Sequence, residues 1–163
     1  MNKCYIGIGS NLASPKKQVL LAIETLDLAE DIVITKKSSL YETKPVDYLE
    51  QPDFINAVIE IETDIFPSSL LAKLQRVECN QGRVRDKARR YGPRIIDIDI
   101  LLYSDRILCT EELVIPASKM LERAFVLYPL AEICPHHYIF SQFDWAAFQR
   151  VHPKPRIILS CSL

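Results

Sequence analysis

Two aspartates, Asp97 and Asp99, lie two positions apart inside the apolar run IIDIDIL of residues 95–101. Side chains alternate between the two faces of a β-strand, so both acids would share one face and the isoleucines would enter the core. At a separation of about 6 to 7 Å, the two charges repel each other by about 2.5 kcal/mol at an effective dielectric near 20, and a bound cation removes that cost. Oxygen ligands without nearby histidine or cysteine are typical of magnesium, which completes its shell with water and substrate phosphates. The pair predicts a nucleotide site, and the alternative is two acids that face solvent from an edge strand.

A basic segment directly precedes this run. Six of the chain's 20 Lys and Arg residues fall within residues 83–94, offset only by Asp86: Arg83, Arg85, Lys87, Arg89, Arg90 and Arg94. Guanidinium groups bind phosphate oxygens through two hydrogen bonds and offset the charge that develops in phosphoryl transfer. By itself the segment could be a solvated charged loop. Beside a carboxylate pair it favours a phosphate site.

Several predicted elements must position these groups. Residues 4–9 alternate as in a strand, Ser14 and Pro15 provide an N-cap and first helical residue, and residues 31–43 and 54–63 are two further predicted strands. A second helix should run from near Ser68 to near Gly82 with Leu71 and Leu74 on its inner face, followed by the strand of residues 95–103.

This order is β-α-β-β-α-β, which predicts an α+β fold with a ferredoxin-like core and an antiparallel sheet. A loop marked by Pro45 and Pro52 separates the second and third strands. Beyond residue 104 the pattern predicts a helix over residues 125–133 and a weakly patterned tail, which together form a C-terminal α/β extension. We expect residues 1–163 to form a single domain.

Composition excludes several classes of protein. Twenty basic residues against 21 acidic ones leave a net charge of -1, which argues against a chain that coats nucleic acid or an anionic membrane. The five cysteines are odd in number and show no C-x-x-C spacing, which indicates a reducing compartment. The sequence shows neither a secretory signal nor an apolar run long enough to span a membrane. We therefore expect a cytoplasmic protein.

Residues 90–101 (RYGPRIIDIDIL) closely resemble the signature of the 6-hydroxymethyl-7,8-dihydropterin pyrophosphokinases of folate synthesis. Shorter segments agree with that family in order and spacing, and the resemblance spans about residues 3–134. These segments are residues 8–12, 41–43, 51–57, 81–85 and 122–127.

The resemblance implies transfer of diphosphate from ATP to 6-hydroxymethyl-7,8-dihydropterin, with release of AMP, by a monomer. It implies that two magnesium ions, bound by Asp97 and Asp99, bridge the β- and γ-phosphates, and that these acids, with Arg83 and Arg94, are the catalytic residues. The residues that it implies for ATP binding are Gln75, Arg83, Arg85, Arg90, Tyr91, Arg94, Ile100 and Arg123.

For the pterin, the resemblance implies that Phe54 and Phe125 sandwich the ring. Asn56 and the backbone near Thr43, Lys44 and Val46 would hydrogen-bond its edge. A flat heteroaromatic ring gains from an aromatic face on each side, and an amide offers both a donor and an acceptor.

The chain departs from the family pattern at three places. Tyr91 stands where tryptophan is frequent, Lys44 where proline is common, and residues 117–118 (Ala-Ser) where many members have a histidine that helps to bind ATP.

Two other functions remain open. A ferredoxin-like module could bind single-stranded nucleic acid, although the paired acids would repel its backbone, and another magnesium-dependent phosphotransferase could share the scaffold.

Overall fold

The computed structural model describes residues 1–84 and 92–160. The first half contains β1 (Asn2–Ser10), α1 (Pro15–Asp27), β2 (Val33–Lys37), β3 (Leu40–Thr43), β4 (Phe54–Thr63), α2 (Pro67–Asn80) and β5 (Asp97–Tyr103). The second half contains β6 (Leu108–Cys109), β7 (Val114–Ile115), the 3-10 turns η2 (Met120–Glu122) and η3 (Tyr138–Ser141), α3 (Ala124–Ile133), α4 (Trp145–Val151) and β8 (Arg156–Leu159).

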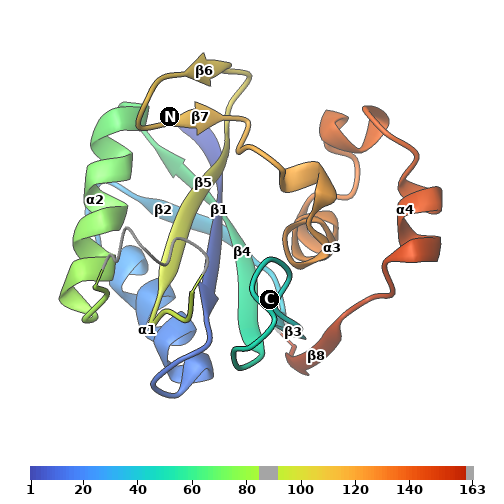
Figure 1. Cartoon of the computed structure of the whole chain (residues 1–163). Helices are drawn as coiled ribbons and strands as arrows, with labels where there is room; N and C mark the ends of the chain where they lie inside the picture. The colour runs from blue at the N-terminus through green and yellow to red at the C-terminus, as the bar shows by residue number, and fades with distance from the viewer. Residues whose placement is uncertain (85–91, 161–163) are drawn as a thin grey trace.

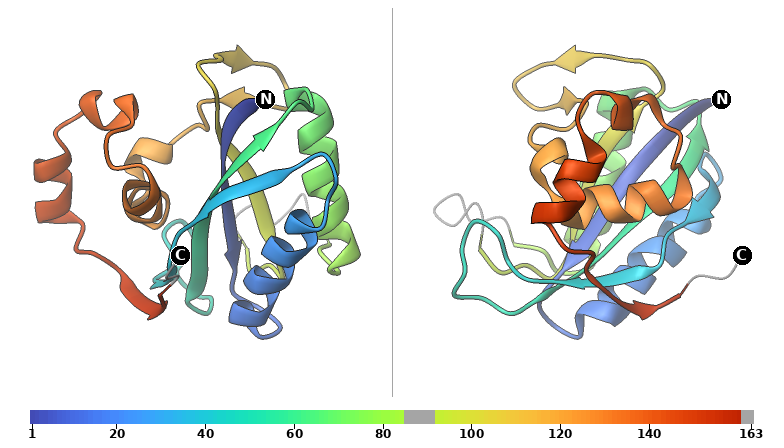
Figure 2. Two further views of the ribbon diagram at one scale, coloured as in Figure 1. Left: turned by 180° about the vertical axis from the view of Figure 1, so that it is seen from behind. Right: turned by 90° about the vertical axis from the view of Figure 1, so that its right-hand side faces the viewer.

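The main sheet is antiparallel and has the strand order β5-β1-β4-β3-β8, with β2 also paired to β4. Helices α1 and α2 cover one face, and α3 lies with the C-terminal segment on the other (Figure 1). The view from behind in Figure 2 shows the same two layers of helices on either side of the strands. The predicted β-α-β-β-α-β order and the antiparallel sheet are confirmed, apart from a break in the second strand.

The main hydrophobic core lies between the sheet and helices α1 and α2. Ile96, Ile98 and Ile100 point into it and are at most 3% exposed, as the alternation predicted. From α2 the fully buried residues are Leu70 and Leu74, whereas Leu71 is only partly buried. Leu71 and Leu74 thus both pack against this core as the sequence analysis expected, with Leu71 at the edge of a buried stripe that also includes Leu70.

Helix α1 begins as predicted at Pro15, but Ser14 does not cap it with its side chain. Ser14 has a φ of 64° instead of the extended backbone that a capping serine adopts. Its backbone carbonyl accepts hydrogen bonds from the N–H groups of Lys17 and Gln18 at 2.9 and 3.1 Å. The start of the helix thus depends on the backbone and on proline.

The predicted strand over residues 31–43 is divided into β2 and β3 by two buried serines. The Ser38 N–H donates to the Val58 carbonyl, and the Val58 N–H donates to Ser38 Oγ, both at 2.9 Å. The Ser38 hydroxyl donates in turn to the Ser39 carbonyl at 2.8 Å. These bonds replace strand pairing at the break, so the chain bends while both pieces stay on β4.

The weakly patterned tail contains more structure than the sequence indicated. Helix α4 packs against α3, and β8 adds a strand to the sheet beside β3. Within residues 1–84 and 92–160, no helix is long and apolar enough to cross a membrane.

Candidate active site

A row of aligned residues crosses four strands on the sheet face opposite α1 and α2. In the strand register Asp97 is paired with Gly9, Gly9 with Asn56, and Asn56 with Tyr41. Paired residues of neighbouring antiparallel strands share a face, so Asp97 and Asn56 lie on either side of a glycine. With strands about 4.8 Å apart, their backbones are about 10 Å from each other. The fold therefore places a predicted metal ligand and a predicted pterin residue on either side of Gly9, which has no side chain. We call this part of the sheet the glycine floor.

Glycine is required on this floor at position 9. A Cβ added to Gly9 would lie 2.5 Å from Asn56 Oδ1, closer than any real contact. The Asn56 side-chain NH2 donates to the Thr43 hydroxyl at 2.7 Å, and both residues are buried. The amide is thus held in one orientation above the floor. Gly7, which is paired with Asp99, differs from Gly9, because a Cβ added there would meet only the Leu101 side chain, at 3.3 Å.

Arg83 is held between two carboxylates. Its guanidinium forms ion pairs with Glu78 and with Asp97, and Glu78 also accepts the Ile98 N–H at 2.7 Å. Burial alone would lower the pKa of Arg83, but the negative charges of Asp97 and Glu78 outweigh it and raise that pKa. Arg83 therefore remains a fixed cation beside the acid pair.

Glu78 is a candidate site residue that the sequence analysis missed. It is 1% exposed at the end of α2 and connects that helix to β5 and to Arg83. A usable signal was present, because Glu78 lies eight positions after Leu70 and four after Leu74, on the stripe that faces the core. An acid on a buried stripe indicates a partner of opposite charge.

Arg94 contacts both halves of the site. Its guanidinium lies 2.9 Å from Asp97 Oδ2 and 5.4 Å from the centre of the Phe54 ring. Its backbone N–H donates to Asn11 Oδ1 at 2.8 Å, and its carbonyl accepts the Asn11 N–H at 3.1 Å. Among the described residues, its buried Nε has no hydrogen-bond partner, so one donor is left for a ligand.

Asp99 lies at the solvent side of the pair. The residue is exposed as a whole, while its carboxyl group is partly desolvated by the protein around it. Desolvation, followed by the negative charges of Asp97 and Glu78, raises its pKa to about 7. The charged form of Asp99 is therefore costly without a cation close to it.

The two predicted ring-binding phenylalanines come from β4 and α3. Phe54 begins β4 two positions before Asn56, and Phe125 lies in the first turn of α3; both are partly buried. The Arg123 guanidinium lies 5.6 Å from the centre of the Phe125 ring, so each phenylalanine has an arginine over it. Cation–π contacts of this kind keep an aromatic ring beside a phosphate-binding group.

The loop between β3 and β4 supplies the remaining predicted pterin contacts. Thr43 ends β3 and is buried, whereas Lys44 is exposed and forms an ion pair of 2.8 Å with Asp53. The Val46 side chain is exposed. Backbone contact to a ligand near Lys44 and Val46 stays a prediction.

The predicted ATP residues are less completely assembled. Gln75 lies on the exposed side of α2, and the Ile100 side chain is in the core, on the face opposite the acids. Ile100 could therefore contact ATP only through its backbone on β5, which is an edge strand. Arg85, Arg90 and Tyr91 lie outside the described residues.

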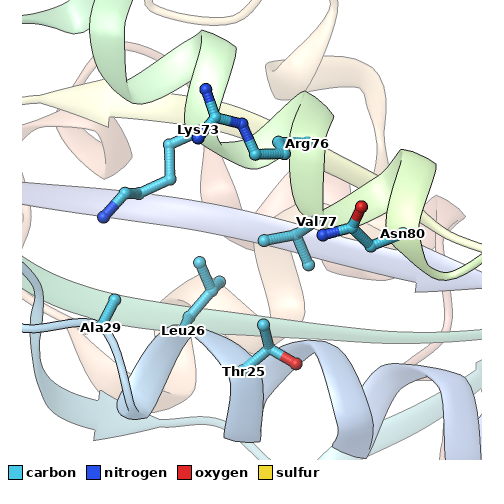
Figure 3. Close-up of a pocket in the computed structure, with 7 residues that line it drawn as sticks. All are labelled: Thr25, Leu26, Ala29, Lys73, Arg76, Val77 and Asn80. Carbon is cyan, nitrogen blue, oxygen red and sulfur yellow. The ribbon is translucent and has the colours of Figure 1, made fainter.

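A groove of about 180 Å³ between α1 and α2 lies away from this floor. Its apolar base is formed by Leu26, Ala29 and Val77, with Lys73 and Arg76 at its rim (Figure 3). Lys73 is already paired with Asp31. The groove lies on the sheet face that α1 and α2 cover, which is opposite the face that carries Asp97 and Asn56.

Comparison with known proteins agrees with this arrangement. Residues 5–135 match the family described as 7,8-dihydro-6-hydroxymethylpterin-pyrophosphokinase (HPPK). The 2-amino-4-hydroxy-6-hydroxymethyldihydropteridine pyrophosphokinase of Haemophilus influenzae is 44% identical over 133 residues, which are 82% of this chain and 82% of that protein. The protein of the same name from Bacillus subtilis is 43% identical over 133 residues, covering 82% of this chain and 78% of that one.

Solved structures share the fold. A crystal structure of HPPK-DHPS in complex with substrates aligns with a TM-score of 0.63 at 14% identity, over 83% of this chain and 42% of that chain. Plasmodium falciparum HPPK-DHPS with pteroate gives a TM-score of 0.62 at 16% identity, over 80% of this chain and 38% of that chain. This chain thus spans about two fifths of those structures. The sequence match over residues 5–135 decides the family: the chain belongs to the 7,8-dihydro-6-hydroxymethylpterin-pyrophosphokinases.

Proposed function

We propose that the chain transfers the diphosphate of ATP to 6-hydroxymethyl-7,8-dihydropterin, giving AMP and the pterin diphosphate. The row that joins Asp97, Gly9 and Asn56 carries this proposal, because it sets a carboxylate site for metal and phosphate beside an amide that suits a pterin. The names of the relatives at 43% and 44% identity give the same reaction class.

The residues present fit magnesium, and we propose two ions. Asp97 and Asp99 offer only oxygen ligands over a glycine floor, and the buried Arg94 Nε–H can still donate to a phosphate oxygen. No group of three or more His, Cys, Asp or Glu side chains in the described ranges could hold a metal. When bound between these acids and the triphosphate, magnesium would neutralise phosphate charge.

In the proposed reaction the hydroxymethyl oxygen of the pterin attacks the β-phosphorus of ATP. A new O–P bond forms, the bond between the α-phosphate oxygen and the β-phosphorus breaks, and AMP leaves with its electron pair. Arg83 and Arg94 would neutralise the charge on the transferred group, because both are held at Asp97 before substrate arrives. The proton of the hydroxyl group is released to solvent, since no side chain is assigned as a base.

Phe54, Phe125 and Asn56 would hold the ring, with the loop that contains Lys44 and Val46 along its edge. Arg123 lies 3.8 Å from Asp47 of that loop and over Phe125, so it connects the loop to α3. Gln75 and the backbone of Ile100, together with Arg85, Arg90 and Tyr91, would complete the ATP site.

We propose that residues 1–163 act as one domain, as a monomer in the cytoplasm. The four cysteines in the described part of the chain are unpaired thiols, which fits a reducing compartment.

The test of function is chromatography of the nucleotide products after incubation with ATP, magnesium and the dihydropterin, beside an Asp97→Ala control. AMP that requires the pterin and is absent in the control supports the proposal. ADP would indicate another phosphotransferase, and nucleic-acid binding without turnover would indicate a binding module.

A further inference from the structure

Some of the residues proposed to bind the pterin, which we call the pterin half of the site, lie on elements that contact the C-terminal segment of residues 145–159. This segment lies beyond the matched residues 5–135. Two elements of that half are β3, which carries Thr43, and α3, which carries Phe125. Resting on the proposed function, we infer that α4 and β8 position β3 and α3 and thereby set the affinity for the pterin without touching it.

Strand β8 completes the sheet next to β3. Tyr41 is paired with Ile157, and Glu42 with Arg156, whose guanidinium lies 3.4 Å from Glu42 Oε2. On its other side Tyr41 is paired with Asn56. The strand that aligns Asn56 and Thr43 is thus held from both sides, and one side is β8.

Helix α4 packs against α3, and its Phe148 belongs to the same hydrophobic cluster as Tyr41 of β3. Phe148 is buried in one cluster with Tyr41, Leu127 and Tyr128. The Tyr128 hydroxyl donates to the His152 carbonyl at 2.6 Å, which connects α3 to the end of α4. Loss of the Phe148 ring would leave a cavity at the junction of α3, α4 and β3.

Helix α3 and β3 are also bonded directly to each other. Glu132 accepts hydrogen bonds from the Ser39 N–H at 3.0 Å, from Ser39 Oγ at 2.7 Å and from the Tyr41 hydroxyl at 2.5 Å. A shift of α3 is therefore transmitted to Tyr41, and a shift of Tyr41 to α3. The metal half lies at the opposite side of the sheet, since β5 and β8 are its two outer strands in the order β5-β1-β4-β3-β8.

The position of the segment predicts a selective effect on the two substrates. Loosening α4 or β8 disturbs β3 and α3, which would raise the KM for the pterin. Arg123, an implied ATP residue, directly precedes α3 and would move with it. The Arg83, Asp97 and Glu78 contacts are made within α2, its following turn and β5, so the KM for ATP should change by less than twofold.

The test compares two variants of the full chain with matched controls. Phe148→Ala opens the cavity, and Tyr128→Phe removes only the hydroxyl bond to His152. Phe66→Ala and Tyr138→Phe are the controls, because both residues are exposed: Phe66 is 68% exposed and Tyr138 is 46% exposed. The measurements are the KM for each substrate and hydrogen exchange of the α3 and β3 amides in the free protein.

We expect Phe148→Ala to raise the pterin KM at least fivefold, Tyr128→Phe to raise it about twofold to fivefold, and both to leave the ATP KM within twofold. Exchange in α3 and β3 should become faster in both variants and stay unchanged in the controls. Equal rises of both KM values, an unchanged pterin KM, or unchanged exchange would overturn the inference. If Phe148→Ala does not fold, Tyr128→Phe decides alone. Absence of pterin-dependent AMP formation by the wild type would instead contradict the proposed function, while exchange would still report the coupling.

Discussion

Individual carboxylates fix the positions of the arginine side chains in the candidate site. Glu78 pairs with Arg83 and accepts the Ile98 N–H of β5, and Asp97 pairs with both Arg83 and Arg94. The spacing of Asp97 and Asp99 and the clustered arginines favoured a phosphate site over solvent-facing groups, and the resemblance to the pyrophosphokinases implied the role of each residue. The position of Glu78 on the buried stripe of α2 was a usable signal, but its partner was not predictable, because the ion pair requires Arg83 to fold back against α2.

Replacing Glu78 with glutamine tests this role. The amide can still accept the Ile98 N–H but cannot neutralise Arg83, which is then held only by Asp97. We expect kcat to fall about tenfold or more, because small displacements of a positioning group are costly, and stability to fall by about 1–3 kcal/mol. Steady-state kinetics and urea denaturation measure both, with Glu24→Gln on the exposed side of α1 as control. A folded Glu78→Gln protein with unchanged kcat would contradict the role.

Glu60 is a second buried carboxylate, far from the site. It accepts hydrogen bonds from the Tyr5 hydroxyl at 2.7 Å and from Thr35 at 2.8 Å, and Lys3 and Lys36 lie 3.5 Å away. Burial alone would raise the pKa of Glu60, but these hydrogen bonds and charges outweigh it and lower that pKa below its ordinary value of 4.5. The charged form is thus favoured in the folded protein.

A lowered folded-state pKa gives stability that is present above pH 4.5 and is lost as the pH falls through the folded-state value. We expect Glu60→Gln to cost about 1–3 kcal/mol of unfolding free energy at pH 7. The difference from the wild type should shrink in acid. Urea denaturation at pH 7 and at about pH 3.5 measures it. A difference that stays constant across this range would show that the charge of Glu60 is not the cause.

Among the elements, β1 contributes to the site two glycines that place no side chain on this face of the sheet. Its glycines lie between the strand of the acids and the strand of Asn56, and they leave space where side chains would otherwise project. The sequence analysis assigned neither glycine a role. Their role follows only from the strand register, which brings Gly9 between Asp97 and Asn56.

Gly9→Ala should affect binding more than folding. The new Cβ would displace the end of the Asn56 side chain, which can move at little cost to the core but is the proposed pterin ligand. We expect the pterin KM to rise about tenfold, which corresponds to about 1.4 kcal/mol, with a small change in stability. Gly7→Ala is the matched control, since its Cβ meets only the Leu101 side chain at 3.3 Å. Equal kinetic effects of the two variants would refute the argument.

The break between β2 and β3 has its own energetic signature. In Ser38→Ala the buried Val58 N–H loses its acceptor, and an unpaired buried donor costs about 1–3 kcal/mol. Chemical denaturation should show that loss, whereas Ser69→Ala on the exposed side of α2 should show almost none. A loss no greater than that of the control would mean that another acceptor replaces Ser38 Oγ. Sequence alone could not locate this break, because Ser38 acts through a partner twenty positions away.

Across the whole molecule, sequence patterning predicted the β-α-β-β-α-β core and its face assignments but not the closing strand. Residues 156–159 form β8 beside β3, although they are only four residues long and follow two prolines. Such a segment has too few alternations to be distinguished from a loop. Its partners on β3, which are more than a hundred positions away, make it a strand.

Both outer strands of the sheet are protected against pairing with a second copy. On β5 the Ile98 N–H is bonded to Glu78 and the Leu101 carbonyl to the Ala117 N–H, and β8 is short with the exposed Arg156 at its start. Protected strands of this kind disfavour association through the sheet. We expect sedimentation equilibrium at micromolar concentration to give one species of 18.7 kDa. A stable species of twice that mass would show that another surface associates.

The position of β8 at the end of the chain has a consequence for synthesis. The strand carrying Asp97 and Asp99 leaves the ribosome well before residues 156–159, so the metal side of the sheet can pair while the outer edge of β3 is still bare. Until the last strand arrives, that edge is open to pairing with another nascent chain. Premature termination after the family-matched residues would therefore release a chain with both aspartates but with an unprotected edge.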